Sequence, residues 1–302
     1  MLTSLLTLYI ISALQSDLNS VAILPNQENF IKTASSGFSS LMEKNSAGPI
    51  KKPEMIKPVI EAKASLAMDI TSGEVLFEKN VHERLQIASI TKLMTVLIII
   101  EENQLDEVVT INSDANGTEG STMYLRTGEQ ITVENLLYGT LINSANDAAV
   151  ALAEHNAKTT DTFVEKMNKR ASELGLINTH FSNPIGLDGS KNYSSAYDIA
   201  ILARYLYHNK FIKKTAGIKE LEVTSIDGKF THKLKSTNEL LNSYLHVKGL
   251  KTGKTPLAGL CLVTIAENDT GNEIITVVLN SPARFSETKI LIDWVFRAYK
   301  WQ

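Results

Sequence analysis

The sequence predicts an α+β domain in which strands from both ends of the chain form one antiparallel sheet. Short apolar-rich segments with turn residues between them stand near the start and near the end of the ordered chain. Between them, apolar residues recur at helical spacing. Strands that enclose a helical region join one sheet when the two ends of the domain meet in space. We expect the helices to form a cluster on one side of that sheet.

The chain is predicted to have three parts, namely residues 1–14, 15–61 and 62–302. The first is mostly apolar and uncharged, which suits a secretory signal or an anchor, although the basic residues that usually precede such a segment are missing. It is too short to span a bilayer comfortably, and an apolar tail without function is the alternative. Residues 15–61 hold clusters of Asn, Ser, Pro, Gly and Lys without a period, and we predict a disordered linker there.

Two strands open the domain, at Ala64–Asp69 and Glu74–Glu78, with a turn at Thr71-Ser72-Gly73 between them. A helix is predicted next, over Ser89–Glu101. Its stretch Leu93–Ile100 is apolar on nearly every side. This helix should therefore be buried inside a sizeable domain.

The middle and the C-terminal part supply the remaining elements. Four further helices are predicted at Val133–Leu141, Ala145–Asn156, Thr160–Leu174 and Ser195–Tyr207. Three short strands follow at Val247–Lys254, Gly259–Glu267 and Glu273–Leu279. The turn Asn268–Asn272 between the last two indicates an antiparallel hairpin, and a helix over Phe285–Tyr299 closes the chain.

Composition and charge give no support to a nucleic-acid-binding protein. The 302 residues carry 30 Lys and Arg against 33 Asp and Glu, a net charge of −3. The single cysteine, Cys261, rules out an intramolecular disulfide, and its apolar neighbours predict a small buried residue rather than a reactive thiol. The six histidines are scattered without the spacing of metal ligands, so no metal site is expected.

The first candidate for chemistry is the pair Ser89 and Lys92. If Ser89 opens a helix, Lys92 lies one turn further on the same face, which brings an amine near a hydroxyl. A serine hydroxyl is a poor nucleophile until a base takes its proton, and a lysine serves as that base when burial or nearby positive charge lowers its pKa. The alternative is a helix cap followed by a solvated lysine, but the apolar surroundings of this helix require a polar partner for Lys92.

Two further motifs are weak by themselves. Ser144 and Asn146 stand at the start of a predicted helix, where a hydroxyl relays a proton and an amide holds a substrate amide; an N-cap is the alternative. Lys251 and Thr252 lie side by side on a predicted edge strand and suit a substrate carboxylate. Gly253 next to them lets a substrate backbone approach closely.

In this order, Ser-x-x-Lys, Ser-x-Asn and Lys-Thr-Gly resemble the signature of penicillin-binding proteins and serine β-lactamases. The chain is also similar to the low-molecular-mass D-alanyl-D-alanine carboxypeptidases from about Ala62 to Trp301. The segments that carry this similarity are Ala88–Thr95, Gly120–Met123, Asn143–Ala149, Gly186–Asp188 and Gly249–Thr255. Five agreements in the same order are far more specific than any one motif.

The resemblance implies a serine D-alanyl-D-alanine carboxypeptidase that removes the terminal D-alanine from peptidoglycan stem peptides through an acyl-enzyme. Ser89 would be the nucleophile and Lys92 its general base, and Ser144 would relay a proton to the leaving amine. The backbone N–H groups of Ser89 and Lys254 would form the oxyanion hole. Neither a metal nor an organic cofactor is needed, and β-lactams should acylate the same serine.

The resemblance also implies the residues that bind the substrate. Asn146 would hold the peptide amide, while Lys251 and Thr252, followed by Gly253, would hold the terminal carboxylate. Arg284 stands where relatives carry a basic residue near the site. The partners would be peptidoglycan stem peptides outside the cytoplasmic membrane, with a membrane tether through the N-terminus and no nucleic acid.

The fold implied is that of the β-lactamase/transpeptidase-like superfamily. It would have an antiparallel sheet of about five strands, with terminal helices on one face and a helical cluster that holds Ser89 on the other. The strand of Lys251 would form one wall of the cleft and the loop of Ser144 the opposite wall.

Two departures from the family pattern leave alternatives open. Relatives often have His directly after Lys-Thr-Gly, whereas this chain has Lys254, which bears on deacylation and carboxylate preference. Many relatives also carry a further C-terminal domain, whereas this sequence stops at Gln302, about where the catalytic domain is expected to end. Relatives without that extension include D,D-endopeptidases, which cut cross-links. A catalytically silent penicillin-binding or peptidoglycan-binding module is the other alternative.

Three rival enzyme or binding classes are disfavoured by missing motifs. A class A β-lactamase needs a Glu-x-x-Leu-Asn context after Ser144, and Glu239-Leu240-Leu241-Asn242 has the wrong spacing. A phosphate loop needs four residues between its glycines, whereas Gly249 and Gly253 have three. A Ser-His-Asp hydrolase with a Gly-x-Ser-x-Gly elbow has no matching sequence.

Overall fold

The computed structural model describes residues 48–188 and 191–302. The predicted signal-like segment 1–14 and residues 15–47 of the predicted linker lie outside the described residues. Within the described part of the chain, no helix is both long and apolar enough to cross a membrane.

A five-stranded antiparallel sheet forms the centre of the fold, with the strand order β3-β2-β10-β9-β8. The strands are β2 (Ala64–Asp69), β3 (Val75–Lys79), β8 (His246–Thr255), β9 (Gly259–Glu267) and β10 (Glu273–Ser281). The N-terminal hairpin joins the three C-terminal strands where β2 pairs with β10. The prediction that strands from both chain ends share one antiparallel sheet, in an α+β fold, is therefore confirmed.

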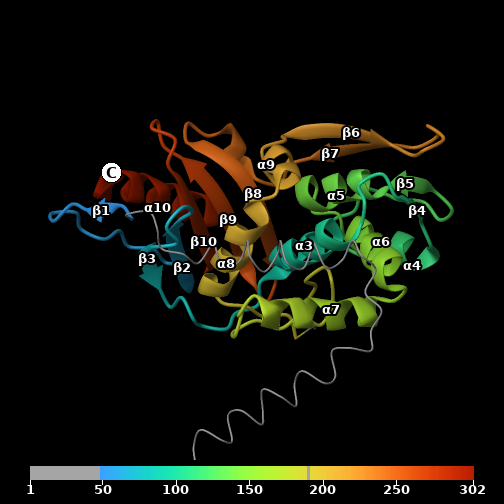
Figure 1. Ribbon diagram of the computed structural model, residues 1–302, viewed down its shortest axis with the longest axis horizontal. Coiled ribbons are helices and arrows are strands. Elements are labelled where there is room, and N and C mark those ends of the chain that lie inside the picture. The colour runs from blue at the N-terminus through green and yellow to red at the C-terminus, as the bar shows by residue number, and fades with distance from the viewer. Residues whose placement is uncertain (1–47, 189–190) are drawn as a thin grey trace, which may run out of the picture. The chain divides into compact units, whose positions relative to one another are not determined.

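Helices cover both faces of this sheet, because the apolar side chains of its central strands are buried on both sides. Helix α10 (Arg284–Ala298) packs Leu291, Trp294 and Val295 against Ala67 and other residues of one face. Helix α8 (Ala196–Tyr207) packs against β10 and β2 from the other side. Figure 1 shows the sheet on one side of the domain and the remaining helices beside it.

The helical cluster surrounds α3 (Lys92–Glu102), whose residues from Lys92 to Ile99 are all buried. Its neighbours are α5 (Val133–Ile142), α6 (Asn146–Ala157) and α7 (Thr160–Glu173). A helix enclosed in this way needs apolar residues on every side, as the sequence pattern predicted. The predicted start differs, since a 3₁₀ turn at Ala88–Thr91 precedes the α-helix and contains Ser89.

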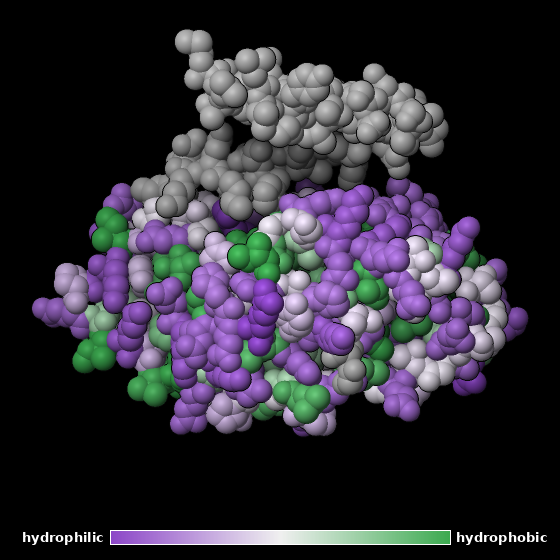
Figure 2. Space-filling model, turned by 90° about the horizontal axis from the view of Figure 1, so that it is seen from below, coloured by the Kyte–Doolittle hydropathy of each residue, from purple (hydrophilic) through white to green (hydrophobic). Residues whose placement is uncertain are grey.

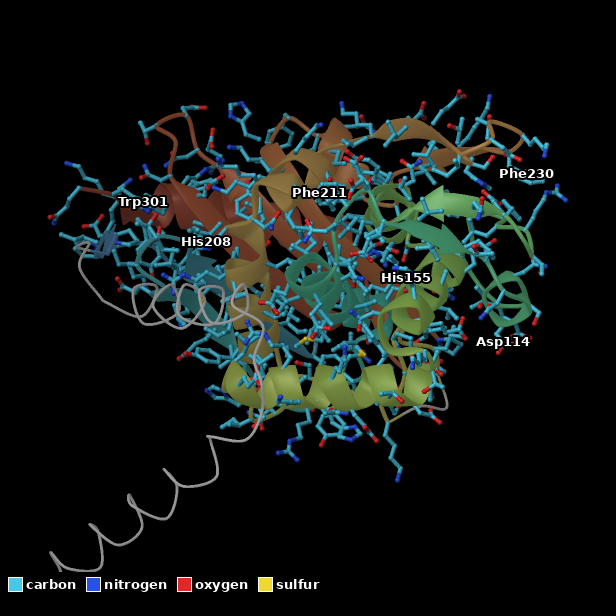
Figure 3. All side chains as sticks on the ribbon, turned by 45° about the vertical axis from the view of Figure 1, so that its right-hand side comes forward. Asp114, His155, His208, Phe211, Phe230 and Trp301 are labelled. Carbon is cyan, nitrogen blue, oxygen red and sulfur yellow. The ribbon has the colours of Figure 1, made fainter. Side chains whose placement is uncertain are left out.

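Several short elements were not predicted from the sequence. They are β4 (Val108–Thr110), α4 (Ser113–Asn116), β5 (Gln130–Thr132), α9 (Lys210–Ala216), β6 (Glu220–Thr224) and β7 (Thr231–Lys235). The β6–β7 hairpin has an Asp-Gly turn at Asp227-Gly228 and alternating side chains, both of which are typical hairpin signals. Phe230 lies at the far end of this hairpin (Figure 3).

The domain begins earlier than the predicted boundary at Ala62. Strand β1 (Ile50–Lys51) pairs with β11 (Tyr299–Lys300), and the indole Nε1 of Trp294 donates to the Ile56 carbonyl at 2.7 Å. Ile60 is buried as well. The prediction of a linker is therefore wrong for residues 48–61, because the end of the chain offers them a strand partner and an apolar surface.

On the face shown in Figure 2, hydrophilic side chains predominate and apolar ones are scattered among them. Cys261 lies inside, where it is fully buried and free, as its apolar neighbours predicted.

Candidate active site

Ser89 lies in the 3₁₀ turn that leads into α3, and two glycines fit closely against this turn. Ala88 has a left-handed backbone with φ of 48°, which few residues other than glycine adopt. A Cβ atom on Gly186 would lie 1.9 Å from the Ala88 carbonyl oxygen, and one on Gly253 would lie 2.8 Å from the Ile87 carbonyl oxygen. The turn is therefore held between two backbone segments that approach it without side chains.

The Lys92 amine is the hydrogen-bond partner of Ser89. Its Nζ donates to Ser89 Oγ at 2.9 Å and to the Ile185 carbonyl at 3.0 Å. Burial lowers the pKa of Lys92 well below its ordinary value, and the nearby Lys251 lowers it further, while Asp147 acts in the opposite direction. An amine in this environment gives up its proton far more easily than a lysine at the surface.

A second hydroxyl–amine pair joins the Ser144 loop to strand β8. Lys251 Nζ donates to Ser144 Oγ at 2.7 Å and to the Thr252 carbonyl at 3.0 Å. Burial, and then the charge of Arg284, lowers the pKa of Lys251 to about 7. Ser144 stands between α5 and α6 with φ of 59°, a strained backbone that tends to occur at functional sites.

Asn146 and Asp147 fix the segment that runs alongside the Ser144 loop. Asn146 Nδ2 donates to the Glu119 carbonyl at 2.6 Å, and the Asn146 backbone N–H donates to the Ser121 carbonyl at 2.6 Å. The buried Asp147 carboxylate accepts the backbone N–H groups of Met123 and Leu125. The wall that carries Ser144 therefore consists of two segments, which both side-chain and backbone hydrogen bonds hold together.

Strand β8 is an edge of the sheet, as predicted, and it presents Lys251 and Thr252 in buried positions. Thr252 Oγ1 lies 2.6 Å from Thr237 Oγ1, and Arg284 Nη1 donates to the Gly253 carbonyl at 2.7 Å. Lys254 is exposed. Within the protein itself, the backbone that approaches Gly253 closely is that of Ile87.

The structure thus brings the three motifs of the sequence into one cluster. Ser89 and Lys92 form one bonded pair, Ser144 and Lys251 form another, and the charge of Lys251 lies near enough to Lys92 to lower the pKa of that amine. In the described residues, no group of His, Cys, Asp and Glu side chains is arranged to hold a metal ion. In such a cluster, a buried amine lies close enough to a serine hydroxyl to take its proton.

The supporting roles of Gly186, Asp147 and Thr237 were not among the predictions from the sequence. Gly186 and Asp147 stand inside segments that carried the family resemblance, so a signal was present for them. Thr237 has no such signal, because only the fold brings it against Thr252.

A substitution at Gly186 tests how closely the turn that contains Ser89 is held. Gly186→Ala should lower acylation of Ser89 about a hundredfold, because the new Cβ overlaps the Ala88 carbonyl and a displacement near 1 Å has about that effect. The φ of 83° at this position adds strain. Stopped-flow measurement of penicillin acylation checks this, with Gly175→Ala as the control. Gly175 also has a positive φ, of 70°, but a Cβ there would meet open space.

The lowered pKa of Lys251 has a consequence for stability. Between about pH 7 and pH 10.5, Lys251 is unprotonated in the folded state but still protonated in the unfolded state. Stability rises with pH wherever the unfolded state binds more protons, so the unfolding free energy of the wild type minus that of Lys251→Met should rise across this window. The slope should approach 1.4 kcal/mol per pH unit, on the order of one proton.

Urea unfolding at several pH values measures that difference. Lys235→Met, at an exposed lysine on β7, is the control for which the difference should stay level. A level difference for Lys251→Met as well would contradict a buried, weakly basic Lys251.

The comparisons with known proteins agree with this geometry. Residues 51–283, which are more than half of the chain, match the family model described as D-alanyl-D-alanine carboxypeptidase. The chain is 39% identical over 248 residues to the D-alanyl-D-alanine carboxypeptidase DacF of Bacillus subtilis, covering 80% of this chain and 63% of that protein. It is 32% identical over 276 residues to the D-alanyl-D-alanine carboxypeptidase of Streptomyces sp. K15, covering 85% of this chain and 94% of that protein.

Solved structures give the same result for the fold. The structure of the Streptomyces K15 DD-transpeptidase has a TM-score of 0.75 with 32% identity, covering 80% of this chain and 99% of that chain. The carboxypeptidase DacD of Francisella tularensis has a TM-score of 0.74 with 32% identity, covering 81% and 73%. The chain spans about 63% of the length of the curated relatives DacF and the Escherichia coli DacC. The matched span and these identities place the chain in the D-alanyl-D-alanine carboxypeptidase family.

Proposed function

We propose that this protein is a serine D-alanyl-D-alanine carboxypeptidase that acts on peptidoglycan stem peptides. The observation that carries the proposal is the buried Lys92 amine at 2.9 Å from Ser89 Oγ, in a chain of this family. The second pair, Lys251 with Ser144 at 2.7 Å, supports the same chemistry.

In the acylation step, Ser89 Oγ attacks the carbonyl carbon of the D-Ala-D-Ala amide while neutral Lys92 takes the hydroxyl proton. The low pKa that burial gives Lys92 supports this role, because a base must be unprotonated near working pH. The backbone N–H groups of Ser89 and Lys254 are the donors we assign to the oxyanion. When the tetrahedral intermediate collapses, the C–N bond breaks and the leaving amine takes a proton through Ser144.

Deacylation returns the enzyme to its starting state. Water attacks the ester carbonyl, the Ser89 oxygen leaves with a proton, and the shortened peptide carries a new carboxylate. Lys254 is exposed, in the place where relatives often have His, and we expect its influence on this step to be electrostatic.

We assign substrate binding from the charges and the hydrogen-bonding atoms of the residues around Ser89. Lys251, Thr252 and Arg284 form the cationic, hydroxyl-bearing end to which we assign the terminal carboxylate. Asn146 Nδ2 donates to the Glu119 carbonyl, so its Oδ1 is the acceptor that we assign to the substrate's peptide N–H. Gly253 permits the close packing of β8 against the nucleophile turn.

Two related activities share the same acyl-enzyme. A D,D-endopeptidase would release the side-chain amine of a second stem peptide instead of D-alanine. Transpeptidation is favoured by one observation, namely that the similar Streptomyces K15 structure is that of a DD-transpeptidase. There the acyl group passes to an amine rather than to water.

Defined muropeptides distinguish these activities. A monomer that ends in D-Ala-D-Ala and a cross-linked dimer are incubated with the purified chain, with and without an acceptor amine, and followed by mass spectrometry. Loss of one alanine from the monomer with an intact dimer is the expected result. Cleavage of the dimer alone would establish an endopeptidase, and an amide product would establish a transpeptidase. If no substrate changes but penicillin is retained, the protein is a silent binding module.

The place of action follows from the substrate. Peptidoglycan lies outside the cytoplasmic membrane, so we propose an extracytoplasmic location, with residues 1–14 as a signal or membrane tether and residues 15–47 as the connection to the domain. β-Lactams are the covalent inhibitors expected for Ser89.

A further inference from the structure

A buried pair of titratable side chains, Glu129 and His232, lies outside the cluster described above. His232 on β7 is 5% exposed and Glu129 is 3% exposed. The ring atom Nε2 of His232 lies 2.6 Å from Glu129 Oε1, and Nδ1 lies 2.7 Å from the Met123 carbonyl oxygen. A histidine held at both nitrogens inside the protein has its orientation fixed.

The partners of the ring determine how many protons it needs. A carbonyl oxygen only accepts, so Nδ1 must carry a hydrogen to bond Met123. The contact between Nε2 and the Glu129 carboxyl also requires one hydrogen, whether it resides on the ring or on the carboxyl. If that shared proton is lost, two lone pairs face each other at 2.6 Å and the contact becomes repulsive.

The Met123 carbonyl belongs to the segment that backs the Ser144 loop. Two residues earlier, the Ser121 carbonyl accepts the Asn146 N–H, and Ser121 Oγ donates to the Asn143 carbonyl. On the far side of Met123 stands Tyr124, which has φ of 65° and is 81% exposed. A residue keeps a strained backbone only where the surrounding contacts hold it in place. The conformation of this segment therefore depends on the hydrogen bonds on its two sides.

Two anchors hold Met123 itself, and they act on opposite atoms of its backbone. Asp147 accepts the backbone N–H groups of Met123 and Leu125 from the side of α6. His232 donates to the Met123 carbonyl from the side of the β6–β7 hairpin. Asp147 is adjacent to Asn146, so a shift of the segment moves the substrate-binding wall with it.

We propose that Glu129 and His232 are positioning residues for the wall that carries Ser144 and Asn146, and that their shared proton keeps this wall in place. Loss of the proton makes the contact between Nε2 and Glu129 repulsive, which displaces the ring together with its bond to the Met123 carbonyl and weakens acylation of Ser89. The effect on acylation rests on the function proposed above, whereas the effect on the wall does not.

Other charged groups around the pair are already engaged. The Arg126 backbone N–H donates to Glu129 Oε2, and its guanidinium lies 5.3 Å from the centre of the Phe230 ring at the hairpin end (Figure 3). On α5, Glu134 accepts from the Tyr138 hydroxyl. The ion pairs between β6 and β7 are exposed; they are Lys233–Glu222 and Lys235–Glu220. Asp147 is bound to backbone N–H groups, so none of these neighbouring charged groups competes for the proton between Glu129 and His232.

The substitution Glu129→Gln separates positioning from a merely structural role. A Gln amide can accept from a protonated Nε2 or donate to a neutral one, so the ring keeps a partner in both protonation states. The wild type loses its contact on deprotonation, whereas this variant does not. A structural role alone would change stability without changing the pH profile of acylation.

The experiment measures the second-order rate of acylation by a fluorescent penicillin, between about pH 6 and about pH 10. The wild-type rate is divided by the Glu129→Gln rate at each pH, which cancels the contributions that Lys92 and Lys251 make to both. The ratio should fall by up to about tenfold per pH unit once the shared proton is lost. Glu222→Gln, the same change at an exposed carboxylate of the same hairpin, should give a level ratio.

A second readout does not depend on catalysis. Hydrogen exchange of residues 119–125 should lose protection at alkaline pH in the wild type relative to Glu129→Gln. His232→Gln, which removes the titrating ring, serves in place of Glu129→Gln if that variant does not fold. A level acylation ratio together with equal exchange in wild type and variant would overturn the proposal. If the wild type forms no adduct, the proposed function fails, while the exchange measurement still decides the role of the pair.

Discussion

Replacing Ser89 by alanine should abolish the covalent penicillin adduct and lower D-alanine release by about four to six orders of magnitude. Loss of the nucleophile in serine hydrolases has an effect of about this size, because only binding and oxyanion stabilisation remain. The Ser89 hydroxyl accepts from Lys92 Nζ in the starting structure, and removal of its oxygen leaves the amine with the Ile185 carbonyl. Intact-protein mass spectrometry after incubation with a penicillin measures the adduct, and muropeptide analysis measures the release.

The matched control for this change is Ser113→Ala, at an exposed serine at the start of α4. This variant should form the adduct at the wild-type rate. An adduct that persists in Ser89→Ala at the wild-type rate would place the nucleophile elsewhere and remove the basis of the proposed function.

Replacing Lys92 by methionine should lower the acylation rate by about two to four orders of magnitude, the range that general bases supply. Methionine fills a similar space in the buried helix but cannot take the Ser89 proton. Lys92→Arg should not restore the rate, since a guanidinium keeps its proton at all working pH values. The pair of variants therefore separates the need for a base from the need for a positive charge. Stopped-flow acylation at several pH values provides the measurement.

Lys169→Met is the control for this experiment, because Lys169 is exposed on α7 and far in sequence from the motifs. Acylation by Lys92→Met at more than about a tenth of the wild-type rate would mean that another group takes the proton. Since the side chain of Lys251 is also buried and lies near Lys92, that result would make Lys251 the candidate for the base.

Much of the fold could be predicted because local pattern and burial agree. The strand Ala64–Asp69 was placed at its observed bounds, and the helix before Glu102 was predicted to be buried from its apolar surface alone. The hairpin of β9 and β10 followed from the turn between them. The β6–β7 hairpin was missed, although its Asp-Gly turn and alternation were present, and no expectation covered the pairing of β1 with β11.

The sequence by itself determined which reactive side chains stand next to one another, because short-range spacing sets each pair. The pairs are Ser89 with Lys92, Ser144 with Asn146, and Lys251 with Thr252. Only the tertiary structure decided how these pairs act together. Lys92 and Lys251 lie 159 residues apart (251 − 92), and burial in one cluster lowers the pKa of both. The contact of Gly253 with Ile87 and that of His232 with Glu129 are likewise long-range. Desolvation and close approach depend on which distant segments the fold brings together, and local sequence patterns do not determine this.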